Sequence, residues 1–188
     1  MNKKLDRRKK YTRMVLKDSL MMLLKAKALS SITVKEICEQ ADINRSTFYA
    51  HYRDPFDLME QIEEKIIVDL NTYLNQYNFA REEESRQMTE KLLEYIASKY
   101  DTCQTLLNEN NDPSFERRIM DVAQQFLMTS WTDHHTIDTD ISEYAGSFLV
   151  GGGIYVIKHW LANNMDQPIE QIARLINSIT IDTGGSGR

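Results

Sequence analysis

Apolar residues along this chain recur mainly three or four positions apart, the spacing that places them on one face of an α-helix. Segments that alternate apolar and polar residues, as strands do, are few. The pattern therefore predicts an all-α fold of about nine helices. The predicted helices cover approximately residues 6–25, 34–41, 45–53, 55–76, 88–100, a short stretch within 101–111, 113–131, 141–163 and the segment after 168. Residues 78–87 are polar and charged, so a loop or a frayed helix start is expected there.

Residues 33–53 contain two short helical patterns separated by a tight turn. Thr33 and Glu36 have the spacing of a capping box, in which two side chains satisfy unpaired N–H groups at a helix start. The pattern then breaks, because Asp42 tolerates a left-handed turn conformation and Asn44 can cap the next helix. These features predict a helix-turn-helix.

The second of these short helices has two chemically different sides. Phe48 and Tyr52 are four residues apart and are expected to point inward, whereas Arg45, Ser46 and Tyr49 lie on the opposite side. A short helix with an apolar back and a hydrogen-bonding front suits the major groove of DNA. Double-stranded DNA is therefore the predicted partner.

Charge is distributed unevenly over a chain whose formal net charge is −5. Residues 1–53 carry 13 Lys/Arg and 5 Asp/Glu, a net of +8, whereas residues 54–188 carry 10 and 23, a net of −13. A run such as KKLDRRKK is by itself equally consistent with a solvated tail. The helix-turn-helix that follows favours a polyanion partner for the basic part.

The composition is that of an ordinary globular protein with 41% hydrophobic residues. Its 188 residues allow one large domain or two small ones. Only three prolines and seven glycines occur, and this low number favours helices. Cys38 and Cys103 are 65 positions apart in separate helical patterns, so we expect no structural disulfide and a cytoplasmic location. The charged start MNKKLDRRKK does not resemble a signal peptide.

The eighth predicted helix is the most apolar. Residues 145–157 carry no charge, but these 13 residues are fewer than the about 20 that a membrane span needs. We expect the helix to be buried on nearly all sides, which one chain of this size rarely achieves. Each of Gly151, Gly152 and Gly153 costs a helix about 1 kcal/mol relative to Ala, so a close helix–helix approach or a kink is expected there.

The last helix has an amphipathic stripe, and together with the eighth it suggests a homodimer through a four-helix bundle. The residues predicted at this dimer interface are Phe148, Gly152, Val156, Trp160, Ile172 and Ile176.

The segments ITVKEICEQADINRSTFYAHYRD and DLMEQI resemble the DNA-binding domain of the TetR family of bacterial transcriptional regulators. The later helices are similar to the family's larger ligand and dimer domain. The resemblance implies a TetR-type helix-turn-helix domain at residues 1–54 and a helical ligand-binding and dimerisation domain at 55–182. Residues 183–188, within TGGSGR, resemble a cloning linker. RSTFYAHYRD and GGGIYVIKHWLANNMDQPIEQIA also resemble a branch that includes regulators of dihydroxyacetone kinase operons.

The resemblance also implies which side chains face DNA. Arg45 can bond a guanine bidentately, and Ser46 can read a base or a sugar. The others suit phosphate, although packing within the head is the alternative for Tyr49 and His51. The predicted DNA-binding residues are Thr33, Lys35, Asn44, Arg45, Ser46, Thr47, Tyr49 and His51.

This sequence departs from the family pattern at two positions. Asp42 replaces the usual turn glycine, which its tolerance of the left-handed region can accommodate. Pro55 replaces a lysine that is common just after the motif, so Arg53 is the candidate substitute for a phosphate contact.

In TetR-like proteins the larger domain usually encloses a small-molecule pocket whose occupancy moves the fourth helix. The candidate effector pocket is formed by aromatic residues between the fourth and eighth helices, with ordinary core packing as the alternative for each. These residues are Tyr73, Tyr77, Tyr95, Tyr100, Phe126, Trp131 and Phe148.

Other chemistry is not expected. His134 and His135, with Asp133 and Asp138, could hold a metal ion, but adjacent histidines in a polar loop are usually solvated. No nucleophile with a matching base is apparent, so neither an enzyme nor a cofactor is predicted. The predicted function is a homodimeric one-component regulator, with repression the expected outcome, that binds a palindromic operator and responds to a small molecule. The alternative is a DNA-binding adaptor or activator whose C-terminal domain binds a partner protein.

Overall fold

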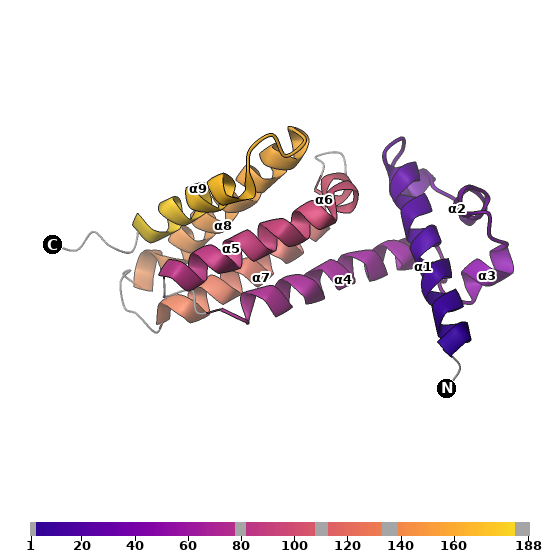
Figure 1. The fold of residues 1–188 in the computed structure, drawn as a ribbon, viewed down its shortest axis with the longest axis horizontal. Helices are drawn as coiled ribbons and strands as arrows, with labels where there is room; N and C mark the ends of the chain where they lie inside the picture. Colours follow the sequence, from indigo (N-terminus) through magenta and orange to yellow (C-terminus); the bar gives the residue numbers. More distant parts are fainter. Residues whose placement is uncertain (1–2, 78–81, 108–112, 133–138, 183–188) are drawn as a thin grey trace. The chain divides into compact units, whose positions relative to one another are not determined.

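The computed structural model of the protein describes residues 3–77, 82–107, 113–132 and 139–182 (Figure 1). These residues form nine α-helices and one 3-10 helix, and no strand occurs among them. The predicted all-α fold is therefore confirmed. The helices are α1 (Lys3–Leu24), the 3-10 helix (Leu29–Ser31), α2 (Val34–Ala41), α3 (Arg45–Tyr49), α4 (Pro55–Leu74), α5 (Glu82–Ser98), α6 (Tyr100–Leu106), α7 (Pro113–Thr132), α8 (Thr139–Ala162) and α9 (Ile169–Asp182).

Helix α5 begins earlier than the apolar pattern predicts. Its first turns include residues 82–87, for which a loop or frayed start was expected, so this expectation was wrong. Arg86 lies 2.7 Å from Glu83 and also pairs with Glu90, and such pairs one turn apart stabilise an exposed helix face. Ser85, on the opposite face, is fully buried. The contact that holds this segment in place is polar, so hydrophobic spacing could not reveal it.

The chain divides into two compact units, Met1–Ile66 and Ile67–Arg188. The division falls inside α4, so the first unit contains about three turns of α4 in addition to the predicted head of residues 1–54. The assignment of functions to residues 1–54 and 55–182 stays a prediction. Residues 183–188 lie outside the described part of the chain.

The first unit is organised by packing of α1 on α2 and of α2 on α3. Its core side chains come from α1 to α4, and each contributes about 1.5–3 kcal/mol when it is fully buried. Tyr52 is buried, as the sequence predicted, and Cys38 is buried as well. The fully buried core residues are Leu16, Leu20, Ile37, Phe48 and Leu58.

The second unit is a set of packed helices in which α5 contacts α9, and α8 contacts both α7 and α9 (Figure 1). Trp160 of α8 is 2% exposed and packs with Leu93 of α5 and Ile172 of α9. Its indole N–H donates to the carbonyl of Gln167 at 2.9 Å, which satisfies the buried donor. Among the described residues, no helix is long and apolar enough to cross a membrane.

A buried polar network joins α5 to α9. Asn177, which is 5% exposed, accepts hydrogen bonds from the Ser85 hydroxyl at 3.0 Å and from the Thr89 hydroxyl at 3.2 Å. Its amide nitrogen donates to the Ala173 carbonyl at 2.9 Å. Every buried side-chain polar atom in the described part of the chain has a partner, so this network is satisfied. Satisfied polar contacts favour one register of two helices over alternatives.

Asn177→Ala should lower the free energy of unfolding by about 1–3 kcal/mol, because the Ser85 hydroxyl then loses its acceptor inside the core. Urea titration followed by circular dichroism measures the change. Gln171→Ala, at an exposed position of the same helix, is the control and should cost less than about 0.5 kcal/mol. Equal losses for the two variants would contradict a stabilising role of the network.

Candidate DNA-binding site

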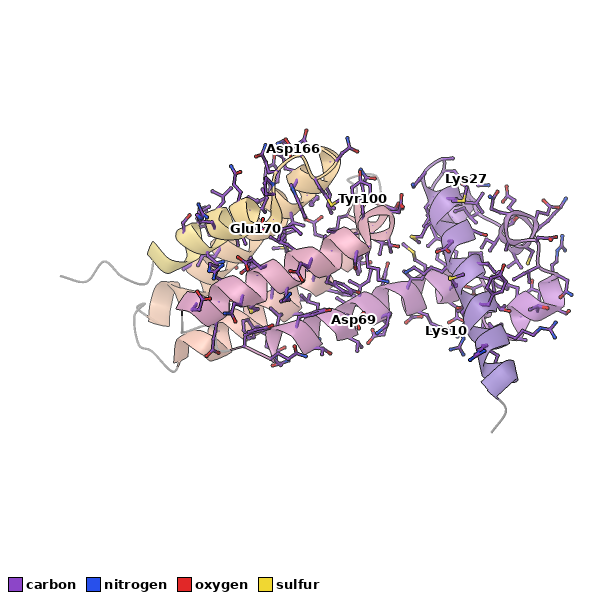
Figure 2. The ribbon with its side chains drawn as sticks, in the orientation of Figure 1. Lys10, Lys27, Asp69, Tyr100, Asp166 and Glu170 are labelled. Atoms are coloured by element: carbon purple, nitrogen blue, oxygen red, sulfur yellow. The ribbon has the colours of Figure 1, made fainter. Side chains whose placement is uncertain are left out.

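A capping box starts α2. The Thr33 hydroxyl oxygen accepts from the Glu36 N–H at 3.3 Å, and the Glu36 carboxylate accepts from the Thr33 N–H at 3.0 Å. Lys27, labelled in Figure 2, adds an ion pair with Glu36 at 2.6 Å. This lysine bond and the Thr33 bonds lower the pKa of Glu36 to about 2. Sequence spacing predicted the box but not Lys27, which precedes the motif and is brought to it by the 3-10 turn.

The turn between α2 and α3 has the left-handed backbone that the sequence predicted. Asp42 has a φ of 52°, and the N–H of Ile43 donates to the Cys38 carbonyl at 3.0 Å. A short polar residue adopts this conformation at lower cost than most non-glycine residues. Asp42 therefore performs the turn for which the family usually has glycine.

Asn44 caps α3 through one oxygen atom. This oxygen accepts from the Thr47 N–H at 2.8 Å, the Thr47 hydroxyl at 2.8 Å and the Ser46 hydroxyl at 2.7 Å. Three of the predicted DNA-facing residues are thus joined in one local network. Their first structural task is to hold the start of a helix only five residues long.

The front of α3 presents polar side chains to solvent. Arg45 and Ser46 are exposed, and Tyr49 is 58% exposed with its ring edge-on to the buried Phe48 at 5.7 Å. Ala50 is also exposed and adds little bulk. Tyr49 therefore packs on Phe48 while remaining more than half exposed, and its contact with DNA stays a prediction.

His51 follows α3 and is half-buried. Burial and the nearby positive charges of Arg13 and Lys9 lower its pKa from the usual value of 6.5. The effect of these charges means that basic residues of α1 lie close to the end of α3. The basic surface of the head therefore includes residues outside the helix-turn-helix itself.

Asp54 and Asp57 cap the start of α4, whose first residue, Pro55, stands where many family members carry a lysine. Asp54 accepts from the Asp57 N–H at 2.9 Å, and Asp57 accepts from the Arg53 N–H at 2.7 Å. The Arg53 side chain is 80% exposed and its Nε lies 3.5 Å from Asp57. Pro55 is buried. Arg53 therefore stays the candidate substitute for the phosphate contact, next to a carboxylate that partly offsets its charge.

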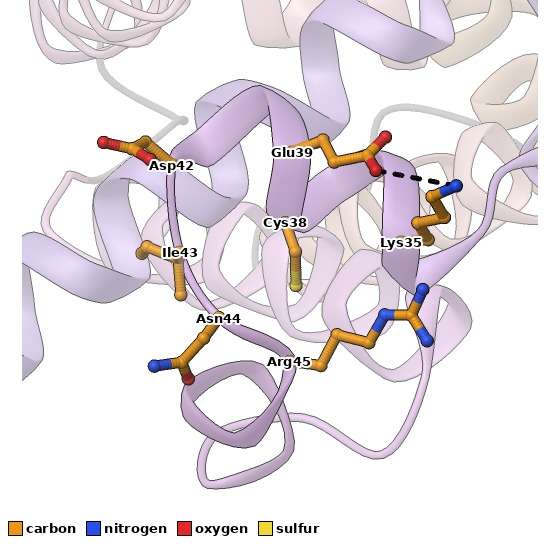
Figure 3. A pocket seen from close by; sticks show the side chains of 7 residues that line it. All are labelled: Lys35, Cys38, Glu39, Asp42, Ile43, Asn44 and Arg45. Atoms are coloured by element: carbon orange, nitrogen blue, oxygen red, sulfur yellow. Dashed lines mark ion pairs between the residues drawn. The ribbon is translucent and has the colours of Figure 1, made fainter.

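A groove of about 490 Å³ separates the start of α3 from α2 (Figure 3). It combines predicted DNA-binding residues with the carboxylates of Asp42, which the sequence pattern singled out for the turn, and of Glu39, which it did not. Helical spacing signals Glu39, because it stands one turn after Lys35 and forms an ion pair with it at 3.7 Å. The residues lining the groove are Lys35, Cys38, Glu39, Asp42, Ile43, Asn44 and Arg45.

The predicted effector-pocket residues are distributed over several packing clusters. The Tyr73 and Tyr95 rings lie 5.3 Å apart, and the Tyr95 hydroxyl donates to Asp69 at 2.9 Å. Burial and this carboxylate raise the pKa of Tyr95 well above its usual value. Tyr100 instead donates to Asn164 at 3.0 Å (Figure 2).

The remaining pocket candidates lie elsewhere. Phe126 and Tyr77 pack beside Leu70, Leu74 and Met88, in the cluster shared by α4, α5 and α7. Phe148 is 71% exposed. The side chain of Trp131 lies outside the part of the structure that is described.

The predicted dimer residues also separate into two groups. Trp160 and Ile172 are buried in the core of their own chain, with Val156 and Ile176 packed against them. Phe148 and Gly152 are exposed. Amphipathic spacing identifies an apolar face but does not say whether the same chain or another covers it.

The residues His134, His135, Asp133 and Asp138 lie outside the described ranges. Within those ranges no group of three or more His, Cys, Asp or Glu side chains could hold a metal ion. Cys38 and Cys103 are both buried and form no disulfide.

A capped helix, a left-handed turn and a short helix with an exposed arginine, carried on a basic three-helix head, define a helix-turn-helix DNA-binding protein. The rest of the chain narrows this class. The family model TetR_C_8, described as the transcriptional regulator C-terminal region, matches residues 83–182, more than half of the chain. The protein belongs to the TetR family of transcriptional regulators. The members of this family are regulators of transcription and not enzymes.

Individual relatives agree with this family. An uncharacterized HTH-type transcriptional regulator, YxbF of Bacillus subtilis (strain 168), is 26% identical over 119 residues. That match covers 60% of this chain but 30% of the relative's own length.

Solved structures share the fold along nearly the whole chain. A TetR transcriptional regulator from Streptococcus agalactiae 2603V has a TM-score of 0.66 at 22% identity, covering 93% of this chain and 96% of that one. The dihydroxyacetone kinase operon activator DhaS has a TM-score of 0.61 at 16% identity, covering 92% and 96%.

Glu36→Gln should weaken the pH dependence of stability between pH 5 and pH 2.5. A carboxylate whose folded pKa is about 2 stabilises the protein fully above its unfolded value of 4.5 and loses this effect as the pH falls towards 2. Urea titrations at several pH values measure the slope. Glu60→Gln, at an exposed position of α4, is the control and should keep the wild-type slope. If the stability of Glu36→Gln depends on pH as steeply as that of the wild-type protein, ionised Glu36 does not contribute to stability in acid.

Proposed function

We propose that the protein is a homodimeric one-component transcriptional regulator that binds a palindromic operator through α3. The observation that carries this proposal is the exposed front of α3, with Arg45 and Tyr49, on a capped helix within a basic head. Two such helices about one helical turn of DNA apart would enter successive major grooves. Repression is the proposed outcome.

Arg45 is proposed to read a base. It is the first residue of α3, is exposed, and is preceded by a cap that fixes the direction of the helix. A guanidinium at such a position can bond guanine O6 and N7 together. Lys35, on α2, is 62% exposed and is proposed to meet a phosphate, which carries no sequence information.

A second copy of the chain is proposed to cover the outer face of α8. Tyr144, Phe148 and Tyr155 are 78%, 71% and 68% exposed and follow the spacing of one helix face. Gly152 lies within this stripe, and a Cβ added there would meet nothing within 4 Å. Within one chain no close helix–helix contact therefore requires a glycine at this position. The close approach of a helix from a second copy would require it.

Helix α9 extends this apolar face. Leu175 and Ile179 are 45% and 44% exposed and lie one turn apart on α9, which packs on α8 (Figure 1). They flank Ile176, which lies 4.0 Å from the position of a Cβ added at Gly153. Continuity of the two stripes supports one interface of four helices, two from each copy. Exposed apolar residues grouped in this way mark interaction sites.

A small-molecule effector is proposed to act through α4. Asp69 of α4 accepts a hydrogen bond from Tyr95 of α5, and the Tyr73 ring is tilted against the Tyr95 ring. A ligand that competes for this carboxylate would change the contact between α4 and α5. The cytoplasmic location, and the alternative of a partner-protein adaptor or activator, stay predictions.

Arg45→Ala should weaken binding to a selected operator by about 1–3 kcal/mol and leave binding to a scrambled duplex nearly unchanged. Lys35→Ala should weaken both duplexes alike and flatten the salt dependence. Sequencing the genomic fragments that the protein retains supplies the operator, and titrations measured by fluorescence anisotropy compare the duplexes. Equal losses on both duplexes for Arg45→Ala would contradict base reading.

Phe148→Glu should shift the protein from dimer to monomer, because it places a charge in the centre of the proposed interface. Analytical ultracentrifugation over a range of concentrations measures the equilibrium. Val68→Glu changes an apolar residue of α4 that is 48% exposed and should keep the dimer. If the wild-type protein sediments as a monomer at micromolar concentration, the dimer proposal is wrong.

A further inference from the structure

The groove between α2 and α3 contains four charged side chains of both signs. Lys35 and Arg45 are the two cations proposed to contact DNA, and Glu39 and Asp42 are carboxylates with no role in that proposal. Figure 3 shows Lys35 and Glu39 together at one side, with the Arg45 guanidinium directed towards them and Asp42 on the other side. Glu39 is therefore the carboxylate paired with Lys35, one of the two cations proposed to contact DNA.

Direct contacts support this arrangement. The Lys35 Nζ lies 3.7 Å from Glu39 Oε1, and the two side chains are 62% and 65% exposed. The charges of Glu39 and Arg45 act in opposite directions on the pKa of the Cys38 thiol, which burial raises. Glu39 and Arg45 thus both lie near the buried Cys38, which lines the groove with them.

Stability of α2 does not explain Glu39. It stands in the last turn of the helix Val34–Ala41, where the negative end of the helix dipole disfavours a carboxylate. An exposed ion pair one turn apart changes an equilibrium by only about one-and-a-half- to fivefold. A residue placed unfavourably for the helix, beside a cation placed favourably for DNA, points to an effect on binding.

We infer that Glu39 sets the DNA affinity of the head by competing with phosphate for Lys35. The inference rests on the proposed function, in which Lys35 contacts the DNA backbone. A phosphate that approaches Lys35 must displace the Glu39 carboxylate and then remain close to its negative charge. Because phosphates carry no sequence information, Glu39 lowers affinity for every duplex alike and lowers the salt concentration at which the protein leaves DNA.

Glu39→Gln tests this inference with little change in shape. The variant should bind both the selected operator and a scrambled duplex about two- to fivefold more tightly per head at low salt. The slope of log affinity against log salt should become steeper by up to about 0.9 per head, because Lys35 then neutralises its phosphate without a competing carboxylate. Fluorescence anisotropy at several salt concentrations measures both, and a thermal melt checks that the fold is kept.

Two further variants separate this effect from a general loss of negative charge. In the Lys35→Ala background, Glu39→Gln should produce little gain, because the cation for which it competes is absent. Asp42→Asn removes a carboxylate from the same groove and keeps a residue that tolerates the left-handed turn. It should give a smaller gain than Glu39→Gln, and Lys35→Ala should not alter that gain.

The outcomes are distinct. The inference is overturned if Glu39→Gln leaves affinity and salt slope unchanged, if its gain persists without Lys35, or if only the operator is bound more tightly. A gain in affinity for the operator alone would mean that Glu39 acts on base reading by Arg45 and not on the phosphate contact of Lys35. Wild-type protein that binds neither duplex overturns the proposed function and this inference together. Salt-dependent wild-type binding that Glu39→Gln does not alter overturns the inference alone.

Discussion

The candidate site depends on the burial of Phe48, the residue on the inner side of α3. Helix α3 spans only Arg45–Tyr49, and an isolated helix of this length is not stable in water. It forms because Phe48 is completely buried and because Asn44 caps the first turn. Arg45 and Tyr49 on its front are thereby carried on a fixed helix, whereas the Ser46 hydroxyl is itself used in the cap.

The turn that precedes α3 and the start of α2 are also fixed by local contacts. Asp42 takes the left-handed backbone, and the Thr33–Glu36 box with Lys27 fixes the start of α2. These local hydrogen bonds hold the two helices that line the groove containing Lys35, Glu39 and Arg45. The carboxylate that we infer to moderate DNA binding therefore lies in the same groove as the two cations proposed to contact DNA.

The second unit combines two uses of apolar surface. Trp160 and Ile172 fill the core between α5, α8 and α9, while Tyr144, Phe148 and Tyr155 of the same α8 remain exposed. A helix with apolar residues on more than one face suits a position between its own chain and a partner. The buried Ser85–Asn177–Thr89 network joins α9 to α5, and α9 also packs on α8.

The sequence by itself determined the all-α class, most helix boundaries, the capping box, the left-handed turn and the exposed front of α3, because each depends on residues within about four positions of one another. Tertiary structure alone decided the rest. It buried Trp160 and Ile172 while exposing Phe148, and it extended α5 to Glu82 through a polar contact between Ser85 and Asn177. It also brings Lys27 into an ion pair with Glu36. Periodicity shows that a helix has an apolar face, but only the packing of distant segments decides which part of that face the same chain covers.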